Sequence, residues 1–152
     1  MRMSNGDILA WQLTHLIARD VCPNELDLFD QIVDEHYAVH KPGEYSPVAF
    51  GGGEIIAMVA SVFAVVLPAL QTIAPKLFDA ALDIGKEILK EELKEKPESI
   101  MSASLASSLD VLKIRELIVN AARAHRLSPS TADAVANAVL AELVQAQGRS
   151  GA

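Results

Sequence analysis

The sequence predicts an all-α protein, in which helical hairpins surround a long, apolar, proline-interrupted central helix. Apolar side chains recur three and four residues apart along most of the chain, which is the period of a helix and not of a strand. Hydrophobic residues make up 51% of the sequence but aromatic residues only 5%, so Ala, Leu, Ile and Val carry the apolar mass. Groups of Pro, Gly and Ser separate the periodic stretches and divide the chain into successive elements.

Residues 1–40 are expected to form an acidic helical hairpin. A polar cap precedes apolar residues at helical spacing, which predicts a first helix over about 7–20. Pro23 then interrupts the chain, and Asn24 is expected to cap a second helix. The negative charge of the protein is concentrated in this region, because residues 1–54 carry nine acidic and three basic side chains, a net charge of −6.

Residues 41–54 are rich in Pro and Gly and are expected to form a linker without regular structure. Three consecutive glycines end this linker just before an apolar stretch, where the backbone amides of a helix N-terminus could hold an anion. The run matches neither a phosphate-binding loop nor a dinucleotide-binding motif, and the carboxylate of Glu54 would repel a phosphate. The glycines are therefore interpreted as a hinge. The expected hinge residues are Gly51, Gly52 and Gly53, together with Pro68 and Pro75 in the next element.

Residues 55–97 are expected to form one long helix that changes character along its length. The stretch 55–75 contains no charged residue in 21 positions and is apolar on nearly every face, so it must be buried on all sides. From Lys76 onwards apolar residues recur on one stripe and charged residues occupy the remaining positions, as in a helix with one solvated side. Pro97 is expected to end the helix.

The charge-free stretch is compatible with two environments. Its length, at about 1.5 Å per residue, is enough to cross a hydrocarbon core of about 30 Å, and lysines follow on its C-terminal side. Its prolines and Gln71 instead favour the buried central helix of a bundle or homo-oligomer, because each proline frees a backbone carbonyl that a membrane would leave unsatisfied. The residues expected to face either the membrane or a protein core are Ile55, Ile56, Val59, Val62, Phe63, Val66, Leu67 and Leu70.

The remainder of the chain predicts a connector, a second hairpin and a tail. Residues 98–107 are rich in serine, which suits a loose connector better than a helix interior. Over 108–147, two apolar runs at helical spacing flank a turn and cap at 128–130. Residues 148–152 form a polar tail that is expected to be disordered.

The apolar stripes of the amphipathic helices predict assembly. Too few aromatic side chains are present to seal these stripes within one small monomer, so self-association or docking on a larger protein complex is expected. The expected assembly face comprises Leu77, Ala81, Ile84, Ile88, Val135, Val139 and Leu143.

Charge and cysteine content exclude two classes of protein. Cys22 is the only cysteine, so no disulfide can form within the chain. The net charge of −7 leaves no chain-wide basic surface for nucleic acid. The segment 124–130 has the outline of a helix-turn-helix, but 131–147 contains no Lys or Arg that could reach base edges. No nucleic-acid partner is therefore expected.

No catalytic, metal or cofactor site stands out in the sequence. His36 and His40 lie four residues apart, as two metal ligands can, but no third ligand is evident and Pro42 follows directly. Cys22 has no base close to it in the sequence, so a buried structural thiol is expected. Neither a serine, histidine and acid arrangement nor a carboxylate pair in an apolar context is present. The sequence therefore predicts a protein without enzymatic activity, cofactor or metal.

Two functional hypotheses follow from these patterns. In the first, the chain is a membrane-associated structural subunit that self-assembles and associates with or inserts into a bilayer through residues 55–75. In the second, it is a soluble, cytoplasmic homo-oligomeric scaffold or adaptor protein with the same segment as its buried central helix. The first is favoured by a small margin, because a chain of 152 residues has little volume in which to bury such a helix.

Overall fold

The computed structural model describes residues 2–39, 58–85, 87–88, 91 and 111–150. Its α-helices are α1 (Asn5–Val21), α2 (Phe29–Val39), α3 (Met58–Ile73), α6 (Val111–Ala124) and α7 (Pro129–Ser150). Two 3₁₀ helices, η1 (Pro23–Leu28) and η3 (Pro75–Phe78), and two short strands, β1 (Arg2–Ser4) and β2 (Ala81–Asp83), complete the described elements. The all-α fold class is confirmed, with a small antiparallel ribbon that the sequence did not predict.

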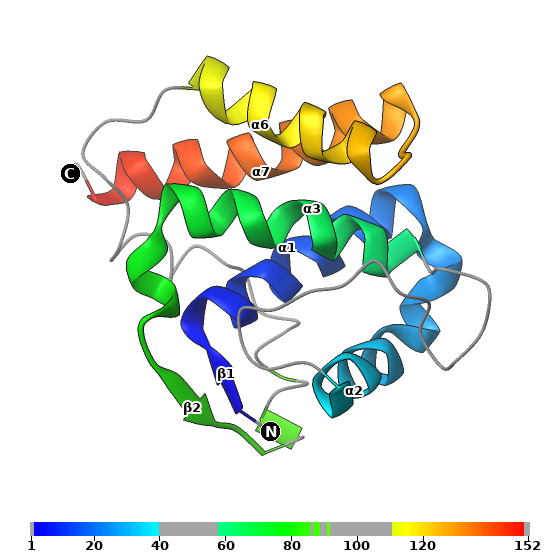
Figure 1. Cartoon of the computed structure of the whole chain (residues 1–152), viewed down its shortest axis with the longest axis vertical. Coiled ribbons are helices and arrows are strands. Elements are labelled where there is room, and N and C mark those ends of the chain that lie inside the picture. Colours follow the sequence, from blue (N-terminus) through cyan, green and yellow to red (C-terminus); the bar gives the residue numbers. More distant parts are fainter. Residues whose placement is uncertain (1, 40–57, 86, 89–90, 92–110, 151–152) are drawn as a thin grey trace.

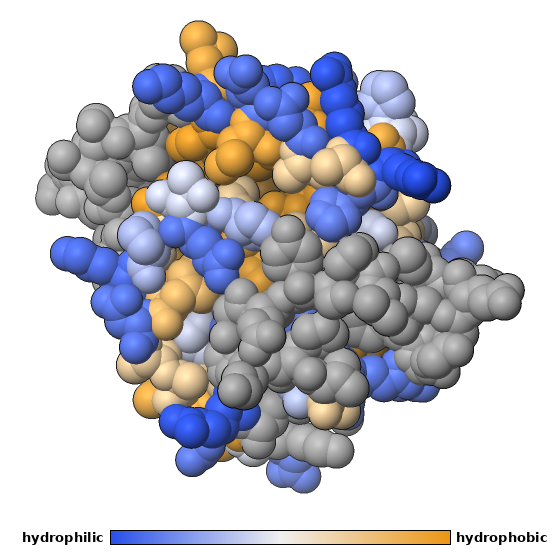
Figure 2. Space-filling model, viewed as in Figure 1, coloured by the Kyte–Doolittle hydropathy of each residue, from blue (hydrophilic) through white to orange (hydrophobic). Residues whose placement is uncertain are grey.

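The helices are arranged around the pair formed by α1 and α3 (Figure 1). The hairpin of α6 and α7 covers this pair on one side, while α2 packs against α3 on another. The ribbon of β1 and β2 lies at the end of the molecule where α1 begins. Figure 2 shows the same face of the molecule, with hydrophilic side chains over much of the described surface and hydrophobic atoms between them, for example in the upper part of the view.

The start of α1 is fixed by a capping box, in which two side chains each accept a backbone N–H at a helix N-terminus. The hydroxyl of Ser4 accepts the backbone N–H of Asp7 at 3.0 Å, and the carboxylate of Asp7 accepts the backbone N–H of Ser4 at 3.3 Å. The expected first helix is therefore present, and it begins two residues earlier than predicted. Directly after the cap, the ring of Phe78 lies so close to Gly6 that a Cβ there would be 2.3 Å from ring carbons.

The second helix begins later than the sequence predicted. Asn24 does not cap an α-helix, because residues Pro23–Leu28 form η1 and α2 starts only at Phe29. No side chain caps η1, and short 3₁₀ turns are common at the N-termini of α-helices.

The long continuous helix expected over 55–96 is not observed. The apolar helix α3 has 16 residues, includes Pro68, and ends at Ile73. Ala74 then leaves the helical region, with φ −137° and ψ 65°, because the following Pro75 disfavours helical geometry in the residue before it and lacks an N–H to continue the ladder. The chain continues through η3 into β2, whose backbone hydrogen-bonds to β1 with Leu82 opposite Met3.

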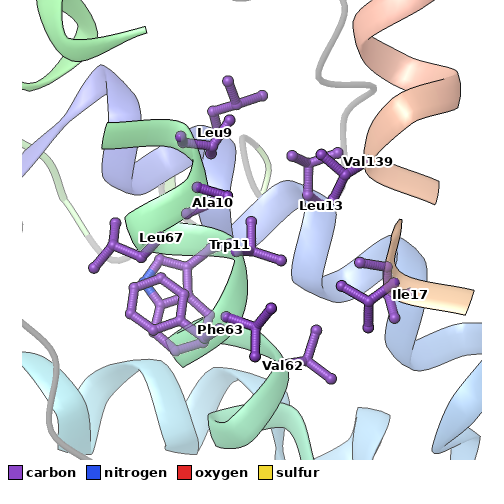
Figure 3. Close-up of a cluster of buried hydrophobic side chains, with 14 of the residues drawn as sticks. Leu9, Ala10, Trp11, Leu13, Ile17, Val62, Phe63, Leu67 and Val139 are labelled. Atoms are coloured by element: carbon purple, nitrogen blue, oxygen red, sulfur yellow. The ribbon is translucent and has the colours of Figure 1, made fainter. Parts of the chain in front are cut away.

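The core forms where α1, α3 and α7 meet. Figure 3 shows side chains of all three helices gathered in one cluster, with the rings of Trp11 and Phe63 stacked at its centre. These two rings lie 3.7 Å apart between centroids and are nearly parallel, at 10°. Leu13 from α1 and Val139 from α7 are fully buried in the same cluster. Trp11 also packs edge to face against Phe29 and Tyr37, so aliphatic side chains surround an aromatic cluster centred on Trp11.

The C-terminal hairpin forms as two antiparallel helices, as the sequence predicted. Arg126 adopts φ 61° in the turn, where a left-handed residue commonly ends a helix. Ser128 caps the next helix, since its hydroxyl accepts the backbone N–H of Thr131 at 3.2 Å. The helix α7 extends through Ser150, so the disordered tail expected from residue 148 is wrong for 148–150. Extending a helix that is already formed costs little, because each added residue contributes another backbone bond.

Three of the predicted regions lie outside the described residues. These are the linker with its expected hinge residues Gly51, Gly52 and Gly53, the apolar residues Ile55 and Ile56, and the serine-rich connector over 98–107.

Candidate functional site

Most of the described part of the charge-free segment, the helix α3, lies inside the protein. Residues of α3 contact α1, α2, α6 and α7, so neighbouring helices of the same chain surround its apolar side chains. The least covered side of α3 carries Ser61 and Pro68, which are half-buried, and Thr72, which is exposed. The expected membrane-facing or core-facing residues that the structure describes are all buried in this core: Val59, Val62, Phe63, Val66, Leu67 and Leu70.

The expected assembly face is largely buried in the chain itself, which corrects the sequence-based prediction. Leu77, Val135, Val139 and Leu143 all belong to the core. Ala81 and Ile84 are half-buried, and Ile88 is exposed. The prediction assumed that aromatic side chains were needed to cover the stripes, whereas α7 covers its stripe by packing on α1, α3 and α6.

A different apolar surface is exposed on the outside of the C-terminal hairpin. Leu112 is 78% exposed and Val144 52% exposed, among the largest values for large hydrophobic residues in the described part of the chain. Val119 and Leu140 are half-buried beside them. Figure 2 shows hydrophobic atoms among hydrophilic side chains in this region, at the top of the view. We call the group of Leu112, Arg115, Val119, Leu140 and Val144 the outer hairpin surface.

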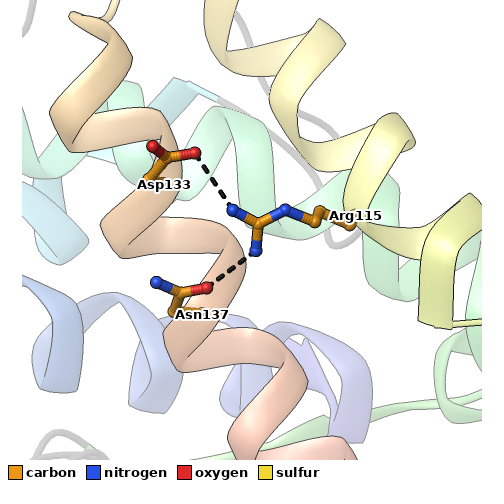
Figure 4. A network of polar contacts seen from close by, with 3 residues as sticks. All are labelled: Arg115, Asp133 and Asn137. Atoms are coloured by element: carbon orange, nitrogen blue, oxygen red, sulfur yellow. Dashed lines mark hydrogen bonds and ion pairs between the residues drawn. The ribbon is translucent and has the colours of Figure 1, made fainter.

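Arg115 connects the two helices at the middle of this surface (Figure 4). Its guanidinium donates to Asn137 Oδ1 at 2.7 Å and to Asp133 Oδ1 at 3.1 Å, so one planar fork binds two acceptors on α7. Asp133 and Asn137 are four residues apart and therefore share one face of that helix. Because both partners are partly exposed, we expect the network to orient the helices more than to stabilise them.

Helical spacing places the apolar members of the outer hairpin surface around Arg115. Leu112 lies three residues before Arg115 and Val119 four residues after it, so both are on its side of α6. On α7, Leu140 and Val144 follow Asn137 by one and two helical turns. The result is an ordered cation flanked by aliphatic side chains, and arginine is one of the residues enriched in protein interfaces.

A second polar cluster is enclosed within the fold and links α1 to α2. The hydroxyl of Tyr37 donates to Asp7 Oδ1 at 2.6 Å and accepts from Trp11 Nε1 at 3.1 Å. Burial, and then the negative charge of Asp7, raise the pKa of Tyr37 well above its ordinary value, so the phenol remains a donor. Asp7 and Ser4 are buried in the same cluster. Since this cluster is enclosed and its donors and acceptors bind one another, its role is structural.

The structure describes only one member of the histidine pair that the sequence offers as possible metal ligands. His36 is buried, with its ring against Trp11, Tyr37 and Phe63 at centroid distances of 4.7–5.7 Å. His40 lies outside the described residues. Over the described parts of the chain, no three His, Cys, Asp or Glu side chains are grouped so that they could hold a metal ion.

The N-terminus of α3 is already occupied by a side chain of this protein. The carboxylate of Glu25, from η1, accepts the backbone N–H groups of Met58 at 3.2 Å and Val59 at 3.1 Å. A carboxylate is favoured there because the first N–H groups of a helix lack partners within it. Burial, and then the charge of Glu25, raise the pKa of the nearby Cys22 thiol to about 11. The thiol is therefore protonated and weakly reactive at neutral pH.

No described helix combines the length and the hydropathy needed to span a membrane. Comparisons of the chain with protein-family models, with curated proteins and with solved structures find no match.

Proposed function

We propose that this chain is a non-enzymatic helical module that binds another protein chain through its outer hairpin surface. The observation that carries the proposal is the 78% exposure of Leu112 beside the ordered guanidinium of Arg115. Fully burying a leucine contributes about 1.5–3 kcal/mol, and most of the side chain of Leu112 is still available for such a gain. Arginine is among the residues that most often carry the binding energy of protein interfaces.

The arrangement of Arg115 supports binding in a second way. A long side chain loses conformational entropy when a partner immobilises it. The two hydrogen bonds to α7 hold Arg115 in one orientation before any partner arrives. Less entropy is therefore lost on binding, and the aliphatic side chains around it can be covered by an apolar patch of the partner.

In this proposal the apolar segment acts as the core of the module, which is the second of the two hypotheses from the sequence. The support is the enclosure of α3 by α1, α2, α6 and α7, since a bilayer would have to replace helices that already cover Val62, Phe63 and Val66. Moving these side chains from a packed core into lipid offers no large hydrophobic gain, because both environments are apolar.

Photo-cross-linking in the cell tests the proposed surface. A photoreactive amino acid is placed at position 112 or 144, and for comparison at position 28, because Leu28 is 51% exposed on η1, in another part of the fold. We expect the same discrete cross-linked product from positions 112 and 144, and none from position 28. The substitution Arg115→Ala is expected to weaken the product from both positions.

The cross-linked partner is identified, and the products obtained from positions 112, 144 and 28 are compared. Products that are absent at both 112 and 144, or that form equally from 28, would contradict the proposed function. A product from 112 that persists unchanged when Val144 is replaced by Glu would also contradict it, because the two positions would then not belong to one surface.

A further inference from the structure

We infer that the α6 side of the outer hairpin surface, with Leu112 and Val119, docks antiparallel on α6 of a second copy of this chain. This inference rests on the proposed function and specifies the partner. It follows from the order of side chains along the outermost row of α6, which consists of Leu112, Glu116, Val119 and Arg123. Their spacing of four, three and four residues places them on one side of the helix.

The row carries both signs of charge on either side of one aliphatic residue. Glu116 and Arg123 are exposed, and Val119, between them in the row, is half-buried. Within the described part of the chain, neither Glu116 nor Arg123 takes part in an ion pair. The opposite, buried side of α6 consists of Ile114, Ile118 and Ala122, and within the row itself only Val119 also packs against the core of its own chain.

A twofold axis beside Val119 makes the row complementary to itself. Glu116 precedes Val119 by three residues and Arg123 follows it by four, which are displacements of about 4.5 and 6 Å along a helix. In an antiparallel pair, Glu116 of each copy is therefore level with Arg123 of the other copy, within about 1.5 Å. The two valines meet at the axis, and two equivalent ion pairs form around them. An isologous interface requires this kind of self-complementarity.

Leu112 extends the same contact at each end of the interface. It precedes Val119 by seven residues, so it is level with the turn that follows α6 in the other copy, at 125–127. In this turn Arg126 is exposed, and Leu127 is half-buried and offers its aliphatic side chain. A helix of 14 residues limits the size of the contact, so we expect a weak dimer with a dissociation constant in the micromolar range.

Charge exchange between the two positions tests the inference. Sedimentation velocity of the full chain between about 1 and 200 µM is expected to show a monomer in equilibrium with a dimer. Glu116→Arg places arginine opposite arginine, and Arg123→Glu places glutamate opposite glutamate, so each variant is expected to dimerise at least about tenfold more weakly. An equimolar mixture of the two variants restores both ion pairs and is expected to form a mixed dimer. The double variant Glu116→Arg/Arg123→Glu is expected to dimerise like the unaltered chain.

Both positions are exposed, and circular dichroism of each variant confirms that the fold is retained before its association is compared. The inference is overturned if the unaltered chain remains monomeric throughout this range, if the single variants dimerise normally, or if the mixture stays monomeric. These outcomes are separate from the test of the proposed function: a cross-linked product at position 112 that contains a different protein would uphold that function and overturn the inference.

Discussion

The helices α3 and α6 differ in how far their apolar side chains are exposed. Over 16 residues α3 carries no charge, and ten of its side chains are buried. By contrast, α6 mixes Lys, Arg and Glu with its apolar residues, and exposes Leu112 almost completely. The more apolar helix is thus the one enclosed by its own chain, while the more polar helix carries the exposed apolar side chain on which the proposed partner surface rests. The apolar content of a helix therefore does not show which of its side chains remain available, because the neighbouring elements decide that.

The largest effect is expected from a substitution in the core. Phe63→Ala removes the ring that stacks on Trp11 at 3.7 Å and leaves a cavity between α1 and α3, so the free energy of unfolding should fall by about 3–5 kcal/mol. Leu112→Ala, on the exposed side of α6, should change it by less than about 0.5 kcal/mol. Urea denaturation measures both. Similar losses for the two variants would remove the contrast between the helices.

A smaller loss of unfolding free energy is expected when the buried polar cluster beside this core is disrupted. Tyr37→Phe takes a donor from Asp7 and an acceptor from Trp11, and leaving buried polar groups without partners costs about 1–3 kcal/mol of unfolding free energy. Urea denaturation of Tyr37→Phe, Asp7→Asn and the double variant completes a mutant cycle. We expect the double variant to lose less than the sum of the two single losses. Strict additivity would show that the two side chains do not act together.

The cap on α3 should contribute less to the free energy of unfolding than the core side chain of Phe63, but more than the exposed side chain of Leu112. Glu25→Ala removes the carboxylate that accepts two N–H groups at the start of α3, and a lost cap typically costs about 0.5–2 kcal/mol. Glu25→Gln keeps an acceptor and should cost less. Asp27→Ala is the control, because Asp27 is another acidic residue of η1 but is exposed, whereas Glu25 is half-buried. Equal stability of Glu25→Ala and Asp27→Ala in thermal or urea unfolding would argue against the cap.

The smallest change concerns the reactivity of Cys22. Because its pKa is raised to about 11 from 9.0, its thiolate forms at higher pH than that of an ordinary cysteine, and its alkylation by iodoacetamide should keep accelerating up to about pH 11. Glu25→Gln removes the negative charge that contributes to this rise. The variant should therefore have a lower pKa and react faster at pH 8 to 9. A rate that levels off near pH 9 in the unaltered chain would contradict this environment of the thiol.

The sequence predicted those features that depend on neighbours along the chain. The first helix, the C-terminal hairpin and the cap at Ser128 follow from local spacing and capping residues. The end of α3 has a local signal as well, because Pro75 disfavours a helical residue before it, but the amphipathic pattern after Lys76 favours a helix that continues.

Features that depend on distant residues could not be predicted. The carboxylate of Glu25 reaches Met58 and Val59 across 33 and 34 positions, and no local pattern marks it as a cap. Arg115 binds α7 across the hairpin, for which the only sequence signal is the four-residue spacing of Asp133 and Asn137. Likewise, periodicity identified the apolar stripe of α7 but not what would cover it, so Val135, Val139 and Leu143 were expected on an assembly face.

Hydrogen exchange of the α3 backbone, with and without lipid vesicles, tests most directly whether the charge-free helix is the core of the fold. The amides of Val62 to Val66 lie in the buried turns of α3 and should exchange only through extensive unfolding. We predict slow exchange in buffer and the same rate after vesicles are added. Exchange within seconds in buffer, followed by strong protection on vesicles, would contradict the conclusion that α3 is the core of the fold and would assign it to the membrane.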